Sequence, residues 1–183
     1  MTRYNTEQVS GWLRDMQQSL QHLSTQTDSH IDGNRGDDSP VAMIGIKTGG
    51  VDVGKHLHKN LGLQEPLGEL NISFYRDDFS TVGLHPVVGP SQVPFSIDGR
   101  HIILVDDVLS TGRTVRAAMN EIFDYGRPSR ITLAVLIQRT GHELPIRADV
   151  IGKAIELSDN MHVSLVASDM SVTISESVRE QGL

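Results

Sequence analysis

Residues 102–114 read Ile-Ile-Leu-Val-Asp-Asp-Val-Leu-Ser-Thr-Gly-Arg-Thr, an apolar run that leads through two acids into a loop of small and hydroxylic residues. The run Ile102–Val105 predicts a short buried strand, with Asp106 and Asp107 at its carboxyl end, where open α/β sheets bind their ligands. A helical pattern begins after Ser110–Thr114, and backbone N–H groups that converge at a helix N-terminus bind anions. Acids that accept hydrogen bonds from sugar hydroxyls, beside a loop that binds phosphate, indicate a sugar-phosphate site.

Strands and helices alternate on both sides of this stretch, which is typical of parallel strands joined by right-handed crossovers. Apolar residues at helical spacing predict helices over 9–23, 53–61 and 115–123. The predicted strands are 41–46, 69–75, 101–105 and 131–137, with shorter candidates at 149–152 and 162–166. We therefore predict a doubly wound, mostly parallel α/β sheet flanked by helices. One domain is expected over residues 1–183, with an N-terminal helix and exposed loop in 1–40 and a long irregular segment in 76–99.

Composition narrows the class of protein. The chain has 183 residues and no cysteine, so disulfides, thiolate catalysis and cysteine-based metal sites are excluded. The first residues are polar, and no apolar run approaches the ~20 residues that a membrane span needs, so we expect a cytoplasmic protein without membrane contact. A net charge of −7 argues weakly against a nucleic-acid binder. The histidines show no metal-ligand spacing, and none is assigned to catalysis.

The central stretch resembles the phosphoribosyl pyrophosphate (PRPP) motif of type I phosphoribosyltransferases, in which two acids follow an apolar strand and a small-residue loop ends in Thr-Gly-Arg-Thr. Other runs narrow the resemblance to the bifunctional PyrR family, whose members regulate pyrimidine operons and also act as uracil phosphoribosyltransferases. These runs are Gly45–Gly50, Gly68–Asp78 and Glu143–Asp149, with Val93–Phe95 and Asp124–Pro128 close to the same pattern. The resemblance covers most of residues 41–152.

The resemblance implies roles for residues in the central stretch and in the preceding turn. Asp106 and Asp107 would be the catalytic residues and would bind the ribose hydroxyls. The 5′-phosphate would be bound by the loop residues Val108, Leu109, Ser110, Thr111, Gly112, Arg113 and Thr114. The turn that would bind pyrophosphate, through a cis-like peptide in this family, comprises Lys47, Thr48, Gly49 and Gly50. The family commonly has arginine where this chain has Gly49, and a plain turn is the alternative reading of this segment.

The resemblance also implies roles outside the two loops. A hood over the reaction centre would begin with Arg76, Asp77 and Asp78 and would exclude water. The base would be recognised by Arg147 and by the backbone around Met161 and Val163. Contacts with RNA would come from Arg130, Arg139, Arg147 and Lys153, although Arg139 and Arg147 equally suit ordinary surface positions. The family usually has aspartate where this chain has Gln138, and its next arginine is spaced differently.

The activity implied is the reaction of PRPP with uracil to give UMP and pyrophosphate, with Mg²⁺ carried by the substrate and no metal held by protein side chains alone. The partners implied are PRPP, uracil, UMP and the leader mRNA of a pyrimidine operon, in a homodimer or a higher homo-oligomer. Two alternatives stay open. One is a regulator that senses UMP or PRPP without catalysis, and the other is a phosphoribosyltransferase for another nucleobase.

Overall fold

The computed structural model describes residues 2–26, 40–72, 89–158 and 160–176. Three helices appear in these ranges: α1 (Thr6–Gln26), α2 (Gly49–Leu61) and α3 (Arg113–Tyr125). The strands are β1 (Thr2–Tyr4), β2 (Val41–Ile46), β3 (Gly68–Leu70), β4 (His101–Leu109), β5 (Arg130–Arg139), β6 (Val150–Ile155), β7 (Met161–Val166) and β8 (Ser171–Glu176). Within the described ranges, no helix is long and apolar enough to cross a membrane.

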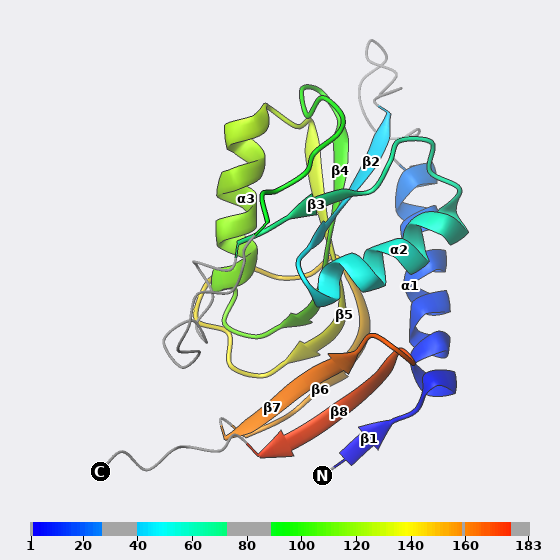
Figure 1. Ribbon diagram of the computed structural model, residues 1–183, viewed down its shortest axis with the longest axis vertical. Coiled ribbons are helices and arrows are strands. Elements are labelled where there is room, and N and C mark those ends of the chain that lie inside the picture. The colour runs from blue at the N-terminus through cyan, green and yellow to red at the C-terminus, as the bar shows by residue number, and fades with distance from the viewer. Residues whose placement is uncertain (1, 27–39, 73–88, 159, 177–183) are drawn as a thin grey trace.

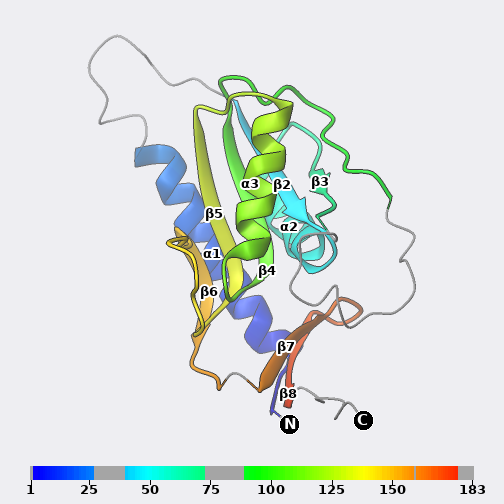
Figure 2. The same cartoon turned by 90° about the vertical axis from the view of Figure 1, so that its left-hand side faces the viewer.

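The larger sheet has five parallel strands in the order β3-β2-β4-β5-β6. Helix α3 covers one face of this sheet, and α1 and α2 cover the other (Figures 1 and 2). The central strands β2 and β4 are almost wholly buried, as expected for parallel strands with helices on both faces. The strand order reverses next to β4, so the ends of β2 and β4 form the crevice where such sheets bind ligands.

Two buried clusters of apolar side chains hold the layers together. One packs Met16 and Leu20 of α1 and Leu57 of α2 against the sheet. The other packs Val115 and Ile122 of α3 against the opposite face. Leu13, Met16, Leu20, Val53, Leu57, Val115 and Ile122 all repeat at helical spacing and are at most 3% exposed, as the amphipathic patterns predicted. Phe123, which the pattern also placed on the buried face of α3, is 45% exposed, so that part of the prediction is wrong.

Strand β4 is longer than the apolar run predicted. It continues to Leu109 because Val108 and Leu109 pair with Ile137 and Gln138 of β5. Asp106 and Asp107 therefore lie inside the strand, near its carboxyl end, and not in the loop after it. Backbone pairing with β5 consequently restrains both acids.

The smaller sheet has three antiparallel strands in the order β1-β8-β7 and was not predicted from the sequence. It lies across the carboxyl ends of β4 and β5, close to the N-terminal half of α1 (Figure 1). Val163, Val172 and Ile174 join the same buried cluster as α1. The Tyr4 and Trp12 rings pack edge to face, with centroids 5.0 Å apart, and so attach β1 to α1.

Part of the expected hood segment lies outside the described residues. The predicted strand 69–75 is observed as β3, Gly68–Leu70, and Glu69 also forms an antiparallel bridge with Gln92. Residues 89–99 form no named strand or helix, in line with an irregular segment. Arg76, Asp77 and Asp78 fall within the range 73–88, which the structure does not describe.

Candidate functional site

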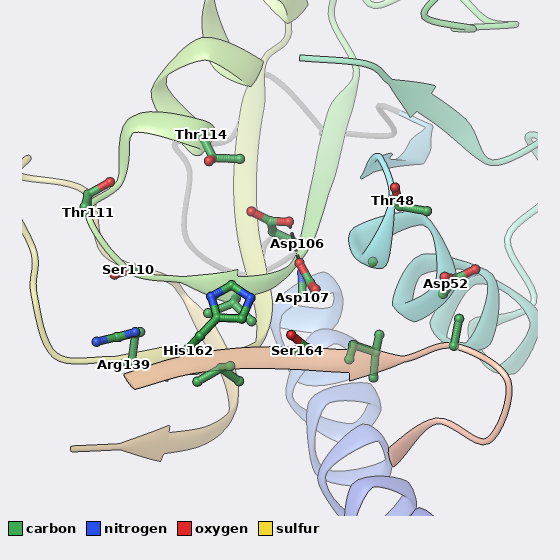
Figure 3. Close-up of a pocket in the computed structure, with 15 residues that line it drawn as sticks. Thr48, Asp52, Asp106, Asp107, Ser110, Thr111, Thr114, Arg139, His162 and Ser164 are labelled. Atoms are coloured by element: carbon green, nitrogen blue, oxygen red, sulfur yellow. Dashed lines mark hydrogen bonds between the residues drawn. The ribbon is translucent and has the colours of Figure 1, made fainter. Parts of the chain in front are cut away.

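A cavity of about 510 Å³ opens between the carboxyl ends of β2 and β4 and the smaller sheet. Figure 3 shows polar side chains entering it from the turn before α2, from β4, from the loop before α3 and from β7. The lining residues are Thr48, Gly49, Asp52, Asp106, Asp107, Val108, Ser110, Thr111, Thr114, Arg139, His162, Val163, Ser164, Leu165 and Ala167. The cavity therefore brings together the two acids, the loop after them and the Thr48–Gly49 turn, which the sequence predicted separately.

Asp106 and Asp107 lie side by side at the centre of this cavity (Figure 3). Asp106 is 4% exposed, and its Oδ1 accepts a hydrogen bond of 3.0 Å from the backbone amide of Asp107. Asp107 is half-buried. Consecutive residues of a strand point to opposite sides, so the two carboxylates point in different directions. Asp106 is on the side of Thr114, and Asp107 is on the side of Thr48 (Figure 3).

The loop from Ser110 to Thr114 has the geometry of an anion site. Gly112 has a φ of 91°, a left-handed conformation that a side chain disfavours, and it precedes the first turn of α3. Ser110, Thr111 and Thr114 line the cavity at the start of α3, and the Thr111 hydroxyl accepts a hydrogen bond of 3.2 Å from the Arg113 amide. The loop is held from behind, because the Thr111 carbonyl accepts hydrogen bonds of 3.1 Å from the amides of Glu143 and Leu144.

Three residues predicted in the phosphate loop do not line the cavity. Leu109 is 1% exposed and belongs to the core beneath α3. Gly112 packs against Leu144, which a Cβ on the glycine would approach to 3.3 Å. The Arg113 guanidinium pairs with the Glu143 carboxylate at 2.6 Å, with about half of each side chain exposed. Arg113 therefore joins the loop to residues 143–144 instead of entering the cavity.

The turn from Lys47 to Gly50 approaches the acids closely. The Lys47–Thr48 peptide is cis, as the resemblance implied. A Cβ on Gly49 would collide with the carboxylate of Asp107, and one on Gly50 would come within 2.5 Å of the Val105 carbonyl. Glycine is therefore needed at both positions for this close contact. Lys47 is not in the lining, and its Nζ lies 3.0 Å from a carboxylate oxygen of Glu69.

Strand β7 forms the wall opposite the acids and brings residues that the sequence did not assign. The imidazole of His162 and the hydroxyl of Ser164 point from β7 toward β4 (Figure 3). Val163, predicted near the base, also lines the cavity, whereas Met161 lies just outside the lining. The weak alternating pattern of 162–166 predicted a strand but contained no signal for its position. Asp52, in the first turn of α2, is a further unassigned lining residue.

The arginines and the lysine predicted to contact RNA do not form one cluster. Arg130 begins β5 and Arg139 ends it, so they are about 30 Å apart at the usual rise of a strand. Arg147 is exposed in the segment between β5 and β6 and does not line the cavity. Lys153 is exposed in β6. Arg139 lines the cavity and donates hydrogen bonds to the carbonyls of Met161, Ser158 and Thr140.

Two further observations concern polar side chains in the described ranges. Within the described ranges, no three histidine, cysteine, aspartate or glutamate side chains are placed to hold a metal ion together. The side-chain Oε1 of Gln138, where the family usually has aspartate, is buried without a hydrogen-bond partner.

Solved structures with the same architecture come from nucleobase phosphoribosyltransferases. The purine phosphoribosyltransferase of Pyrococcus horikoshii matches with a TM-score of 0.57 and 20% identity, covering 81% of this chain and 83% of that chain. The hypoxanthine phosphoribosyl transferase of Trypanosoma cruzi matches with a TM-score of 0.61 and 19% identity, covering 84% and 77%. At identities this low, the structural matches establish the fold alone. They confirm the predicted α/β class.

Sequence relatives identify the family. The family model described as phosphoribosyl transferase domain matches residues 13–169. A bifunctional protein PyrR of Nitrosococcus oceani is 61% identical over 130 residues, which are 70% of this chain and 73% of that protein. A bifunctional protein PyrR of Pseudomonas aeruginosa is 51% identical over 147 residues, covering 80% of this chain and 85% of the relative. The chain therefore belongs to the bifunctional PyrR family of phosphoribosyltransferases, which confirms the pyrimidine-linked transferase and regulator predicted from its sequence.

Proposed function

We propose that the cavity binds PRPP and uracil and transfers the ribose 5-phosphate to the base, giving UMP and pyrophosphate. The observation that carries this proposal is the placement of two carboxylates between an anion-binding loop and a glycine turn, around one cavity. A ligand with a phosphate at one end, a diol in the middle and a pyrophosphate at C1 matches that order of groups.

Asp106 and Asp107 would accept hydrogen bonds from the ribose 2′ and 3′ hydroxyls. The 5′-phosphate would bind the hydroxyls of Ser110, Thr111 and Thr114 together with the first amides of α3, where the helix dipole favours an anion. The pyrophosphate would lie against the Thr48–Gly49 turn. Both ends of the sugar would then be fixed. Its C1 would face the part of the cavity that His162 and Val163 of β7 line.

The chemical step needs no covalent nucleophile from the protein. The C1–O bond to pyrophosphate breaks, the bond from C1 to N1 of uracil forms, and a general base accepts the N1 proton. The loose, cationic transition state would be stabilised by the nearby carboxylates, of which Asp107 is also a candidate base. The segment 76–99 is the proposed hood that would exclude water during the step.

Mg²⁺ is proposed to arrive with PRPP. The carboxylate of Asp107, which faces the cavity near the Thr48–Gly49 turn, suits this ion, which keeps several waters and few protein ligands. When bound, the ion would neutralise charge on the departing pyrophosphate.

A test of the site removes charge from the two acids. The double variant Asp106→Asn with Asp107→Asn should lose measurable binding of PRPP and UMP in calorimetry and should form no UMP from labelled PRPP and uracil. Asp124→Asn, an exposed acid of α3, is the control with full binding. Unchanged affinity in the double variant would refute the site. A panel of other nucleobases tests the alternative enzyme, because only uracil should yield a nucleotide.

The regulatory role is proposed to use the same nucleotide site together with RNA contacts by Arg130, Arg147 and Lys153, in a homodimer or a higher homo-oligomer of the cytoplasm. Arg139 is proposed to contribute less, because the carbonyls around β7 already occupy its guanidinium. Binding of leader RNA should weaken steeply with added salt, since phosphate contacts release counterions. An affinity that salt does not change, or no affinity at all, would contradict this role. Tight UMP binding without turnover would instead favour the non-catalytic sensor.

A further inference from the structure

Asp52 is a carboxylate in the cavity that the proposed reaction has not required for binding sugar or phosphate. It lies in the first turn of α2 and lines the cavity next to Thr48 and Gly49. Its side chain is 24% exposed. The Nζ of Lys55 lies 3.8 Å from its carboxylate, and the lysine side chain is 64% exposed, so water screens that pair strongly. Asp52 therefore contributes negative charge at the end of the cavity proposed for pyrophosphate.

The start of α2 would otherwise attract anions. The first N–H groups of a helix have no intrahelical acceptor, and the helix dipole places partial positive charge there. Thr48, at the N-cap position, makes no side-chain capping hydrogen bond, although its carbonyl accepts one of 3.2 Å from the Val51 amide. A carboxylate in the first turn opposes that partial charge. Asp52 thus weakens an anion site that the backbone alone would provide.

Among the residues that the structure describes, basic side chains do not offset this effect at the same end of the cavity. Lys47 lies 3.0 Å from the Glu69 carboxylate, with each side chain about a quarter exposed. Gly49 has no side chain, and the Asp107 carboxylate occupies the place that a Cβ would take. Among the described residues that line the cavity, the acids are Asp52, Asp106 and Asp107 and the only arginine or lysine is Arg139. That arginine binds carbonyls at the β7 wall.

We propose that Asp52 is a specificity-determining residue that makes the site favour a nucleoside monophosphate over PRPP when divalent cations are scarce. This proposal rests on the proposed function. The phosphate of UMP would bind at the Ser110–Thr114 loop, across the cavity from Asp52, whereas the pyrophosphate of PRPP would lie beside Asp52. Repulsion between like charges then weakens PRPP selectively, and a divalent cation bound to the pyrophosphate relieves it. The site would consequently bind UMP more tightly than PRPP at low Mg²⁺ and would bind PRPP well at high Mg²⁺.

The test is calorimetry of Asp52→Asn with PRPP and with UMP, each at low and at saturating Mg²⁺. Asparagine keeps the size of the side chain and removes its charge. We expect the Kd for PRPP to fall about five- to tenfold at low Mg²⁺. The variant lacks the Coulomb repulsion between Asp52 and the pyrophosphate, which solvent screens only in part. The Kd for UMP should stay within about twofold, and the gain for PRPP should shrink as Mg²⁺ or salt is added. The unchanged UMP affinity also shows that the variant is folded.

Asp124→Asn is the matched control, because it changes the net charge equally from an exposed position on α3 outside the cavity. It should alter neither Kd. Equal shifts of both ligands in Asp52→Asn, or no shift of PRPP, would overturn the selectivity role. Failure of the unaltered protein to bind either ligand would instead overturn the proposed function, so the two failures are distinguishable.

Discussion

The guanidinium of Arg139, the last residue of β5, donates a hydrogen bond to the carbonyl of Met161, the first residue of β7. A second hydrogen bond, of 3.1 Å, reaches the carbonyl of Ser158. Beside it, the hydroxyl of Thr140 donates to the Leu157 carbonyl at 2.7 Å and accepts from the Leu157 amide at 3.1 Å. Side chains at the end of the parallel sheet thus position the strand that forms the opposite wall of the cavity.

Replacing Arg139 by alanine should loosen β7 and weaken UMP binding about tenfold, because each hydrogen bond from a charged group contributes roughly 1.5–3 kcal/mol and the wall must be ordered again on binding. Isothermal calorimetry measures the affinity, and hydrogen exchange of the β7 amides measures the order of the strand. Arg130→Ala, at the other end of β5, is the control and should change neither. Faster β7 exchange with unchanged affinity would mean that the wall does not position the ligand.

Gly49→Ala should weaken both UMP and PRPP by about tenfold or more, because the new Cβ collides with the carboxylate of Asp107 and forces it from its position. Titration of each ligand by calorimetry measures the loss. Gly11→Ala is the control, since a Cβ at that position in α1 meets no atom within 4 Å. The control should bind both ligands normally. Its free energy of unfolding should rise by about 0.5–1 kcal/mol, because alanine has a higher helix propensity than glycine. Full affinity in Gly49→Ala would show that the acid has another way to reach the ribose.

His162→Ala should separate base binding from phosphate binding. If the pyrimidine lies against the imidazole that β7 presents to the cavity, the variant loses stacking worth about 1 kcal/mol, and the Kd for UMP rises about fivefold. Ribose 5-phosphate, which has no base, should bind both proteins equally. The control is His142→Ala, an exposed histidine outside the cavity lining. Equal losses for the two ligands would place His162 away from the base.

Asp169 should make the smaller sheet sensitive to acid. Its pKa is lowered below the ordinary value of 3.8, first by the hydrogen bond with the Ser171 side chain, then by the Ser171 amide and by Arg3. A carboxyl group with a lowered folded-state pKa stabilises the fold above its unfolded pKa, and this contribution is lost as the pH falls through the folded value. Thermal unfolding between pH 6 and 3 should therefore show a smaller acid loss in Asp169→Asn than in the unaltered protein. Identical pH profiles would exclude a role for this group, and Asp124→Asn provides the comparison.

The central site could be predicted from the sequence because its parts are local. The strand, the two acids, the loop and the start of α3 follow one another within residues 101–114, so a short stretch defines their chemistry and their order. Periodic apolar residues likewise located the buried face of α1 and that of α3 except for Phe123, which is exposed. The resemblance to a known family then supplied the substrate, which residue patterns alone left as a sugar phosphate.

The far wall of the cavity could not be predicted, because no local pattern records which strands will meet. Thr2–Tyr4 and Ser171–Glu176 pair across almost the whole length of the chain. Val163 then packs in the core with residues of α1, so the alternate residues His162 and Ser164 face the acids of β4. No sequence pattern pointed to Asp52 either, because its proposed role depends on the cavity that it lines and not on its position in α2.

The amino-acid sequence by itself determined the parallel α/β class, the order of the strand, the two acids and the loop before α3, and the family, since short-range spacing and burial carry that information. Only the tertiary structure decided that Arg113 pairs with Glu143, that Asp107 lies against Gly49 and that β7 closes the cavity. Those relationships depend on contacts between residues far apart in the chain, which form only when the described sheets and helices pack together.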